Sequence, residues 1–571
     1  MTSFESILEK LKVKSDDWYA AEPCSCGFCD GKSEHIGFSS ISIDPLLGAR
    51  VSVSSLLFVV GELFSMPEWA KLLILVISAL IAGYDIVLNA VKSVMNKNFF
   101  SEYLVISIAA IAAFAVGRGF EGTAVILLYQ FGVCIYSVSI KWTKQYLYSR
   151  AIDTATNDDK AANILGLLLS HSEKKSKFEM LIRKIAKFFI PGFLAAAALT
   201  AILLPVFTDL SIKQGIYRSA IVLVIASPAA ILVSVPLSFF AGIGKALNLD
   251  MIFKDMQSVE AMSNTKIVVF EKSGTLTHGN YRVASVRSER FGAKMLLKIA
   301  AHAEAYSTHP IAKAVTEAYA KRINTDLIDS FMEYPSEGVG VRVADMEILL
   351  GSAEFLLRNS VNIWNEIDKT EIAIFMSVEG KYAGKIILGE RLREDSISAV
   401  RDVEKVGGSI AMITGDGGEL SARFAEMLGI TEYYSDCLPA DKVIRVHEMK
   451  RRADRKTLVF VSEGRNSEDA LSEADVGVLL GQKNIDAADV LIIDEKPGKV
   501  ASAIYLAKHT KKIAMYCVAI CAVVKTALLV CGLFGLVPLW VACFIDSTMT
   551  FVAILNAMRA YSIMPPNLAE K

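Results

Sequence analysis

One stretch decides the fold of the soluble part of the chain: Lys266-Ile-Val-Val-Phe-Glu-Lys-Ser-Gly-Thr-Leu-Thr277. Its apolar half has the length and composition of a buried strand, and polar residues with a glycine follow from Glu271 onward. Three later runs show the same change, namely 409–413 before Thr414-Gly415-Asp416, 457–461 before Ser462-Glu463-Gly464, and 490–494. Such runs predict a parallel α/β sheet, whose chemistry lies at the carboxyl ends of the strands.

On both sides of this region, apolar runs reach the roughly 17–25 residues that a helix needs to cross a bilayer. The hydrophobic fraction is 53% and the mean hydropathy is +0.41. The candidate spans form four hairpins, at about 47–64, 70–91, 102–116, 120–140, 185–207, 216–242, 513–534 and 536–558. The sequence therefore predicts a polytopic α-helical membrane protein with about eight transmembrane helices.

The charge balance limits the classes of partner. Lysine plus arginine number 60 and aspartate plus glutamate number 61, so the formal net charge is −1. This balance provides no overall electrostatic footprint for nucleic acid, and the apolar content excludes intrinsic disorder. Basic residues in 141–150 and 174–184 place one side of the membrane in the cytosol. We expect an integral protein of the plasma or inner membrane, embedded in its lipid bilayer, with cytosolic soluble domains.

Composition also divides the chain into segments. We expect an N-terminal cytosolic tail (1–46), transmembrane helices 1–4 (47–140), a short basic cytosolic linker (141–184), helices 5–6 (185–244), an α/β domain (245–278 and 386–510) interrupted by an inserted domain (279–385), helices 7–8 (511–560) and a C-terminal tail (561–571).

The loop after the first strand resembles a known motif. Glu271-Lys272-Ser273-Gly274-Thr275 is similar to the Asp-Lys-Thr-Gly-Thr phosphorylation motif of P-type ATPases, and Ser227-Pro228-Ala229 stands where heavy-metal-transporting members carry Cys-Pro-Cys. The chain is identified as a member of that family, with a resemblance from about residue 41 onward. It implies a HAD-like α/β phosphorylation domain with an inserted α+β nucleotide-binding domain. The implied phosphorylation-site residues are Glu271, Lys272, Thr275, Thr414, Gly415, Asp416, Lys442, Glu463 and Asn466.

The inserted domain carries the family's nucleotide signature in altered form. Tyr306-Ser-Thr-His-Pro310 resembles the Ser-Glu-His-Pro segment, with Glu304 five residues before His309. Gly338-Val-Gly340 matches the Gly-x-Gly of the same pocket. The resemblance implies ATP binding through Glu304, His309, Gly338 and Gly340. The alternative is a vestigial pocket that no longer binds nucleotide.

The membrane spans suggest the zinc/cadmium/lead branch of the family. Glu121, Lys525 and Asp546 look like the intramembrane residues of those exporters, and together with Ser227, Pro228 and Ala229 they are the implied metal site. Charged groups in hydrocarbon are costly and are functional by default. The alternative is a structural Lys525–Asp546 ion pair that holds the helices together.

Several residues depart from the family pattern. Glu271 replaces the aspartate nucleophile, and a carboxylate one methylene longer misplaces its oxygen by about an ångström, which costs on the order of a hundredfold in rate. The hinge reads Ser462-Glu463-Gly464-Arg-Asn-Ser467, so Glu463 stands at the magnesium-binding aspartate and Ser467 at the final one. Because Mg²⁺ tolerates little geometric error, we expect a degraded magnesium site and no phosphoenzyme.

Two further departures concern the actuator domain and the membrane thiolates. Between the fourth and fifth spans only about Tyr148 to Arg183 is available, fewer than the roughly 40 residues that a domain with its own core requires, and Thr-Gly-Glu does not occur in the chain. We therefore expect that the actuator domain is missing. Ser227 and Ala229 cannot supply soft thiolates. Cys517, Cys521 and Lys525 share one helical stripe, and Cys543 with Asp546 forms an i, i+3 pair. These residues either form a substitute thiol–carboxylate site or merely pack.

The N-terminal tail contains three clustered cysteines. Cys24, Cys26 and Cys29, with His35 nearby, form either a site for zinc or another thiophilic ion, or an unligated tail.

These observations lead to a functional expectation with two alternatives. We expect a pseudo-ATPase, which binds ATP or a divalent metal such as zinc without turnover. The first alternative is a divergent ATP-driven exporter of zinc or cadmium. The second alternative is a passive metal conduit or a structural partner of an unidentified membrane protein.

Overall fold

The computed structural model describes residues 45–96, 101–154, 177–335, 337–368, 371–454, 456–464, 467–481 and 488–566. Contacts divide the chain into two units. The helical unit comprises Met1–Ser263 and Tyr505–Ala569, and the soluble unit comprises mainly Asn264–Ile504. The described part of the first unit is almost entirely helical, whereas the second combines β-sheets with helices.

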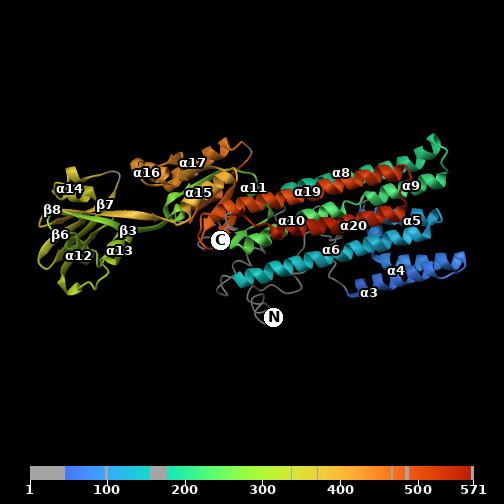
Figure 1. Ribbon diagram of the computed structural model, residues 1–571, viewed down its shortest axis with the longest axis horizontal. Helices are drawn as coiled ribbons and strands as arrows, with labels where there is room; N and C mark the ends of the chain where they lie inside the picture. The colour runs from blue at the N-terminus through green and yellow to red at the C-terminus, as the bar shows by residue number, and fades with distance from the viewer. Residues whose placement is uncertain are drawn as a thin grey trace. The chain divides into compact units, whose positions relative to one another are not determined.

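The helical unit has a helix at each of the predicted spans (Figure 1). They are α3 (Pro45–Leu63), α4 (Glu68–Met95), α5 (Glu102–Ala115), α6 (Gly119–Thr154), α8 (Lys177–Phe207), α9 (Ile212–Ile225), α10 (Ala229–Leu247), α19 (Lys499–Leu533) and α20 (Leu539–Met558). Among the described residues, five helical segments are long and apolar enough to cross a membrane, and α5 and the first half of α6 are shorter apolar helices. Both ends of the segment expected as a linker, 141–184, are helical, because α6 continues to Thr154 and α8 begins at Lys177.

The sixth predicted span is broken in the middle. α9 ends at Ile225 and α10 begins at Ala229, with Ser227 and Pro228 between them. Proline lacks an amide hydrogen and clashes with the preceding turn, so the helix stops there. Ser227 is nevertheless buried, with an exposed fraction of 5%. The break therefore lies inside the helix bundle, where it places non-helical backbone among packed side chains.

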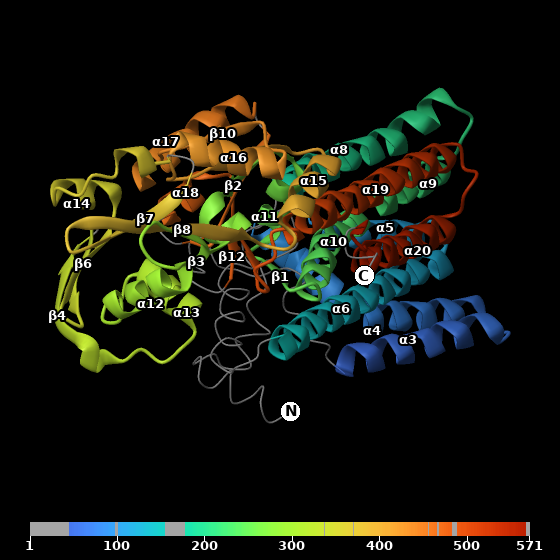
Figure 2. The ribbon, with the colours of Figure 1, turned by 60° about the vertical axis from the view of Figure 1, so that its left-hand side comes forward.

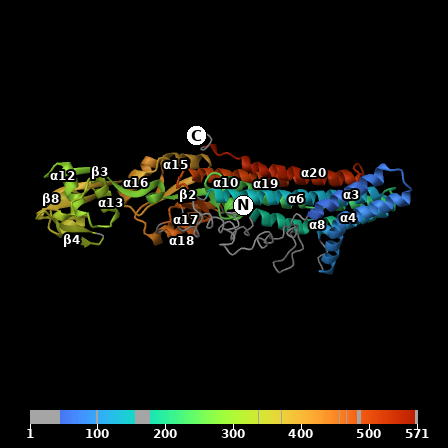
Figure 3. The ribbon, with the colours of Figure 1, turned by 90° about the horizontal axis from the view of Figure 1, so that it is seen from below.

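Small and polar residues hold the first helices together. The hydroxyls of Ser54 in α3 and Ser78 in α4 each donate to the other's carbonyl oxygen, at 2.7 and 2.8 Å. Arg50 forms an ion pair with Asp85 at 3.1 Å, and Gln130 of α6 donates to the same carboxylate at 2.8 Å. The α3–α4 hairpin packs beside α6 (Figure 3). These polar pairs satisfy groups that would otherwise be costly in an apolar environment.

The soluble unit contains the parallel sheet that the sequence predicts. Its strands run in the order β13-β12-β11-β2-β9-β10, and every one of these pairings is parallel. The bounds are β2 (Thr265–Glu271), β9 (Ser409–Ile413), β10 (Glu432–Tyr434), β11 (Thr457–Ser462), β12 (Val476–Leu480) and β13 (Val490–Ile492). The four predicted strands are confirmed, whereas β10 and β12 were not predicted. The central strand β2 lies between β9 and β11.

Helices connect these strands, as a parallel sheet requires. They are α15 (Ser396–Lys405), α16 (Gly418–Leu428), α17 (Pro439–Arg452) and α18 (Glu468–Glu473). The helical unit also contains a short strand, β1 (Met251–Phe253), the helix α11 (Met256–Ser263) and a terminal turn, η6 (Arg559–Ser562). The loop after β2 forms a single tight turn, η2 (Lys272–Leu276).

The inserted domain is an antiparallel sheet in the order β3-β8-β7-β6-β5-β4. Its strands are β3 (Thr277–Ser288), β4 (Ile328–Tyr334), β5 (Gly338–Val343), β6 (Met346–Gly351), β7 (Ile372–Val378) and β8 (Lys381–Leu392). α12 (Ala293–Ala303) and α13 (Pro310–Tyr319) pack on one apolar face, and α14 (Ala353–Arg358) packs in a separate cluster (Figure 2). Short turns η3 (Thr325–Leu327) and η4 (Trp364–Glu366) complete it. The insertion is thus α+β, as expected.

Candidate functional site

The carboxyl ends of three neighbouring strands meet at one edge of the parallel sheet. Glu271 ends β2, Thr414 follows β9, and Ser462 ends β11. Because β2 pairs with both β9 and β11, these three positions lie side by side. The sheet therefore brings together the phosphorylation-site residues that the sequence predicted from separate motifs.

The Glu271 carboxylate is buried and fully engaged, with 5% of the residue exposed. One oxygen accepts a hydrogen bond from Ser467 at 2.8 Å and an ion-paired hydrogen bond from Lys442 of α17. The other oxygen accepts from the Ser462 hydroxyl. Lys442 also donates to Ser467 at 3.1 Å. Both carboxylate oxygens are thus held by donors that come from β11, α17 and the segment before α18.

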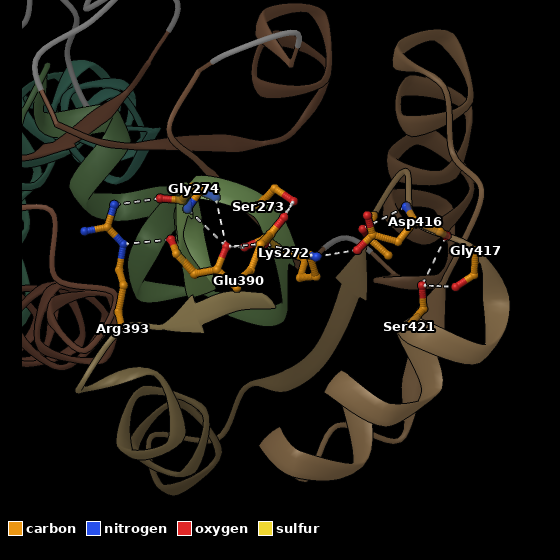
Figure 4. A network of polar contacts seen from close by, with 11 residues as sticks. Lys272, Ser273, Gly274, Glu390, Arg393, Asp416, Gly417 and Ser421 are labelled. Carbon is orange, nitrogen blue, oxygen red and sulfur yellow. Dashed lines mark hydrogen bonds and ion pairs between the residues drawn. The ribbon is translucent and has the colours of Figure 1, made fainter. Parts of the chain in front are cut away.

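Lys272, the next residue, is at the centre of a second network (Figure 4). It is fully buried, at 0% exposure. Its ammonium lies 3.0 Å from the Glu390 carboxylate, forms an ion pair with Asp416, and sits 4.6 Å from the centre of the Phe424 ring. A buried ammonium needs compensating charge, and these two carboxylates supply it for Lys272.

Sequence reasoning missed two members of this network, Glu390 and Arg393. Glu390 also accepts a hydrogen bond from Thr277 at 2.7 Å, and Arg393 donates to the Gly274 carbonyl oxygen at 2.7 Å. The available signal was the charged run 390–395, at the point where the chain returns from the inserted domain. These two side chains fix the tight turn that follows Glu271.

Gly274 and Glu463 are in close contact. Gly274 has a φ of +75°, and a Cβ added there would lie 2.1 Å from the Glu463 carboxyl carbon. The neighbouring Thr275 is fully buried, and its hydroxyl has no hydrogen-bond partner among the described residues. The backbone amide of Asp416 bonds to the Thr414 hydroxyl at 3.1 Å, which shapes the loop containing Gly415. Asn466 lies outside the described residues.

The predicted nucleotide residues lie at the ends of α12 and α13. Glu304 follows α12 and is buried at 6% exposure. Burial, with a smaller contribution from Glu333, raises the pKa of Glu304 to about 7, against a weaker opposing effect of Ser307. His309 is exposed at the start of α13, where its Nδ1 accepts from the Ile311 amide at 3.2 Å. The imidazole is therefore oriented while its outer part remains available.

The two glycines of the predicted pocket differ in their surroundings. A Cβ at Gly338 would lie 2.3 Å from the Leu350 carbonyl oxygen, so the close β5–β6 pairing requires glycine there. A Cβ at Gly340 would meet its nearest atoms only at 3.4 Å, which is ordinary contact. The packing of the sheet thus explains Gly338 without a nucleotide.

In the helical unit, Lys525 of α19 and Asp546 of α20 form a buried ion pair. Their side-chain exposures are 4% and 14%. Lys525 also donates to the Ile225 carbonyl oxygen at 3.2 Å, at the end of α9. The ion pair therefore sits against the broken helix.

A carboxylate that the prediction did not include lies at the same place. Glu102, in the first turn of α5, accepts a hydrogen bond from Ser227 in the helix break. It is also close enough to Asp546 and Lys525 to interact with them electrostatically. Its position at the start of an apolar span was visible in the sequence, but its partner was not.

The structure places Glu121 away from the Lys525–Asp546 pair. The Glu121 carboxylate accepts from Arg118 and Tyr217, both at 2.7 Å, and from the Leu539 amide at 3.0 Å. It thus stabilises the start of α20, because a carboxylate is favourable at a helix N-terminus. The Cys543 thiol likewise points to the Val125 carbonyl oxygen, at 3.7 Å, so it does not extend the α19 cysteine stripe.

The described residues contain no group of three or more histidine, cysteine, aspartate or glutamate side chains arranged to hold a metal ion. Cys24, Cys26, Cys29 and His35 lie outside the described residues.

Sequence comparisons identify related proteins. The model of a hydrolase family, the haloacid dehalogenase-like hydrolases, matches residues 265–475. The chain is 29% identical to the cadmium, zinc and cobalt-transporting ATPase of Bacillus subtilis (strain 168), over 84% of this chain and 81% of the relative. It is 31% identical to the zinc-transporting ATPase of Synechocystis sp. (strain ATCC 27184 / PCC 6803 / Kazusa), over 71% of this chain and 57% of that protein.

The fold has a counterpart among solved structures. A crystal structure of a zinc-transporting PIB-type ATPase in the E2.Pi state superposes with a TM-score of 0.67, at 20% identity, over 90% of this chain and 99% of the other. At that identity the likeness concerns the fold alone. The expected fold class is confirmed: apolar membrane helices combined with a HAD-like α/β domain.

Proposed function

The chain belongs to the heavy-metal P-type ATPase family, and from this premise we propose that it transports a divalent metal ion of the zinc and cadmium class. It is an integral, multi-pass membrane protein with cytosolic soluble domains. We favour the exporter over the pseudo-ATPase because the relatives are metal-transporting ATPases.

The observation that carries the proposal is the Lys525–Asp546 pair beside the broken helix. Ionisable groups within membrane helices are costly and mark ion pathways by default. Discontinuous helices line ion sites because their freed backbone carbonyls can bind a cation. The Lys525 ammonium pairs with Asp546 and donates to the Ile225 carbonyl oxygen. An entering cation would replace that ammonium at both oxygens.

The soluble unit supports ATP binding. Glu304 can pair with the adenine edge, and the exposed His309 ring can stack on the base. The buried Thr275 hydroxyl, which lacks a partner among the described residues, is a donor suited to a phosphoryl oxygen. These groups lie on the inserted domain and on the loop after β2, where they would bind the two ends of a nucleotide.

The residues around Glu271 fit Mg²⁺ less well than the soluble unit fits ATP. Both oxygens of Glu271 already accept hydrogen bonds, from Ser462, Ser467 and Lys442. Mg²⁺ needs near-ideal octahedral oxygen ligands, and glutamates at 271 and 463 replace the shorter aspartates of the family motif. We therefore propose that the magnesium site is degraded.

This saturated carboxylate favours a second candidate function, the pseudo-ATPase. A glutamate held by three donors is poorly placed for attack on a phosphoryl group, because phosphoryl transfer depends on positioning. In this candidate the chain binds nucleotide and metal but forms no phosphoenzyme. We also propose that the actuator domain is absent, which would act in the same direction.

One experiment separates these candidates. The protein is reconstituted in vesicles containing a zinc-sensitive dye, and radiolabelled ATP is used in parallel to detect label that hydroxylamine releases. Transport predicts zinc uptake that requires ATP and is lost in both Asp546→Asn and Glu271→Gln. ATP binding without label or uptake would indicate the pseudo-ATPase. Uptake that needs neither ATP nor Glu271 would indicate a passive conduit.

A further inference from the structure

A second group of polar and sulfur-containing side chains lies on the same stripe of α19 as Lys525. Cys517 and Cys521 are buried, with exposures of 1% and 0%. Cys517 packs against α10 and α20 in a cluster with Val233 and Ile554. Cys521 packs in the next cluster with Met549. The two thiols are therefore enclosed between α19, α10 and α20, one and two helical turns before Lys525.

Polar groups surround the Cys517 thiol in the buried interior of the helix bundle, where unpaired polar atoms are costly. The Asn556 amide donates to the sulfur at 3.1 Å, and the thiol donates to the Ala553 carbonyl oxygen at 3.6 Å. The hydroxyls of Ser234 and Ser238 in α10 also face this sulfur. Ser234 is fully buried, and with Ser238, Asn556 and the Ala553 carbonyl it makes the surroundings of this sulfur polar.

The sulfur atoms suit a thiophilic cation. Residues at i and i+4 of a helix are neighbours, with Cβ atoms about 5–6 Å apart, so Cys517 and Cys521 can converge on one ion. Thiolates and thioethers prefer soft or borderline metals such as cadmium and zinc. Met549 offers a thioether beside Cys521. The donor set thus differs from the oxygen atoms around Asp546.

Charge balance also fits a divalent ion. Two thiols are neutral, and two thiolates with one divalent cation are neutral as well. The low-dielectric interior therefore encloses no net charge in either state, and no lysine is needed as a counter-charge. Asp546, by contrast, is compensated by Lys525 when no ion is bound.

We propose that Cys517 and Cys521, assisted by Met549, form a second metal site for a thiophilic divalent cation, separate from the Lys525–Asp546 pair. On binding, each thiol gives one proton to solvent and each sulfur forms one bond to the metal, so two protons leave for each ion and nothing is oxidised or reduced. The inference goes beyond the proposed transport function, because the site would bind metal whether or not ATP is hydrolysed.

The test uses the full chain, purified in detergent, with Cd²⁺ as the probe. Cys24, Cys26 and Cys29 are replaced by serine in all samples, so that the N-terminal cysteines cannot contribute. We expect one thiolate-bound equivalent of Cd²⁺, identified by a thiolate-to-metal absorption band, with two protons released for that ion, read by calorimetry in buffers of different ionisation enthalpy. Any Cd²⁺ bound at Asp546 would add to the total without contributing to the band. Cys517→Ser and Cys521→Ser should each weaken binding at least tenfold and remove the band.

Cys543→Ser is the matched control, because Cys543 is also buried but directs its thiol to the Val125 carbonyl oxygen. It should leave the band and the affinity unchanged, and Asp546→Asn should leave the band in place. Loss of the band in Asp546→Asn would overturn the separate site, and its persistence in Cys517→Ser would overturn the assigned ligands. Cadmium NMR of the protein in which only Cys24, Cys26 and Cys29 are replaced counts the sulfur ligands without any further variant. A chemical shift typical of oxygen ligands alone would also overturn the proposal.

Discussion

The strongest stability prediction concerns Asp546→Asn. Removing one partner of a buried ion pair leaves the other charge uncompensated, which costs about 3–5 kcal/mol in soluble proteins. Lys525 would keep its hydrogen bond to the Ile225 carbonyl at 3.2 Å, and the new amide oxygen could still accept one. We therefore expect a loss at the lower end, about 3 kcal/mol. The loss should appear even without added zinc, because it arises from the Lys525–Asp546 pair, and zinc that binds at Asp546 should make the difference larger.

The assay is equilibrium unfolding in mixed micelles of increasing SDS fraction, followed by tryptophan fluorescence. Glu62→Gln provides the control, since Glu62 and Lys71 form a more exposed ion pair at 2.7 Å, whose removal should cost no more than about 1 kcal/mol. The double variant Asp546→Leu with Lys525→Met should recover most of the lost stability, because it removes both charges. A loss for Asp546→Asn near 0.6 kcal/mol, roughly the average for polar contacts between transmembrane helices, would refute the reasoning. Unchanged stability with lost zinc binding would show instead that Asp546 serves the metal alone.

Three further predictions concern the soluble unit. The pKa of Glu304 is about 7 in the folded protein and near 4.5 when unfolded, so the folded state holds the extra proton between these values and stability falls as pH rises through that window. Glu304→Gln should remove this pH dependence of stability and raise the melting temperature at pH 8. An unchanged pH profile of stability in the variant would contradict the prediction. Gly274→Ala should lower stability by roughly 1–2 kcal/mol from the left-handed backbone alone. A further loss should come from the clash with the Glu463 carboxyl group, and Glu463→Ser should relieve that part in thermal melts. Equal losses from Gly274→Ala with and without Glu463→Ser would exclude the clash. His309→Ala should weaken ATP binding at least tenfold in calorimetry and lower the melting temperature only by the small amount expected for a lost helix cap. Undiminished heat of binding would remove His309 from the pocket.

Features that depend on local pattern could be predicted from the sequence. Apolar runs located the membrane helices, and the changes from strand to loop located Glu271, Thr414 and Ser462. Their meeting at one sheet edge follows from a general rule for parallel sheets. Proline disfavours a continuous helix at Pro228, but it does not locate the break by itself, because α8 continues through Pro191 and Pro205 and α10 through Pro236.

Features that depend on distant pairings could not be predicted. Glu102 meets Ser227 from 125 positions away, and Glu121 meets the Leu539 amide from 418 positions away. No periodicity in either segment indicates which helix lies opposite. Glu390 joins the Lys272 network only because the inserted domain returns the chain to that place. Tertiary packing decided these contacts, and the family motifs drew attention to Glu121 instead of Glu102.

The inserted domain leaves and re-enters the α/β fold through adjacent strands. Thr277 at the start of β3 pairs with Leu392 at the end of β8, while β2 and β9 pair directly with each other in the parallel sheet. The two crossing points are thus neighbours, and the sheet's own register does not depend on what lies between them. In evolutionary terms this is a domain insertion site: a gene can gain, lose or exchange a whole domain there without altering a strand pairing of the parallel sheet. The inserted domain and the parallel-sheet domain can therefore accumulate substitutions at different rates.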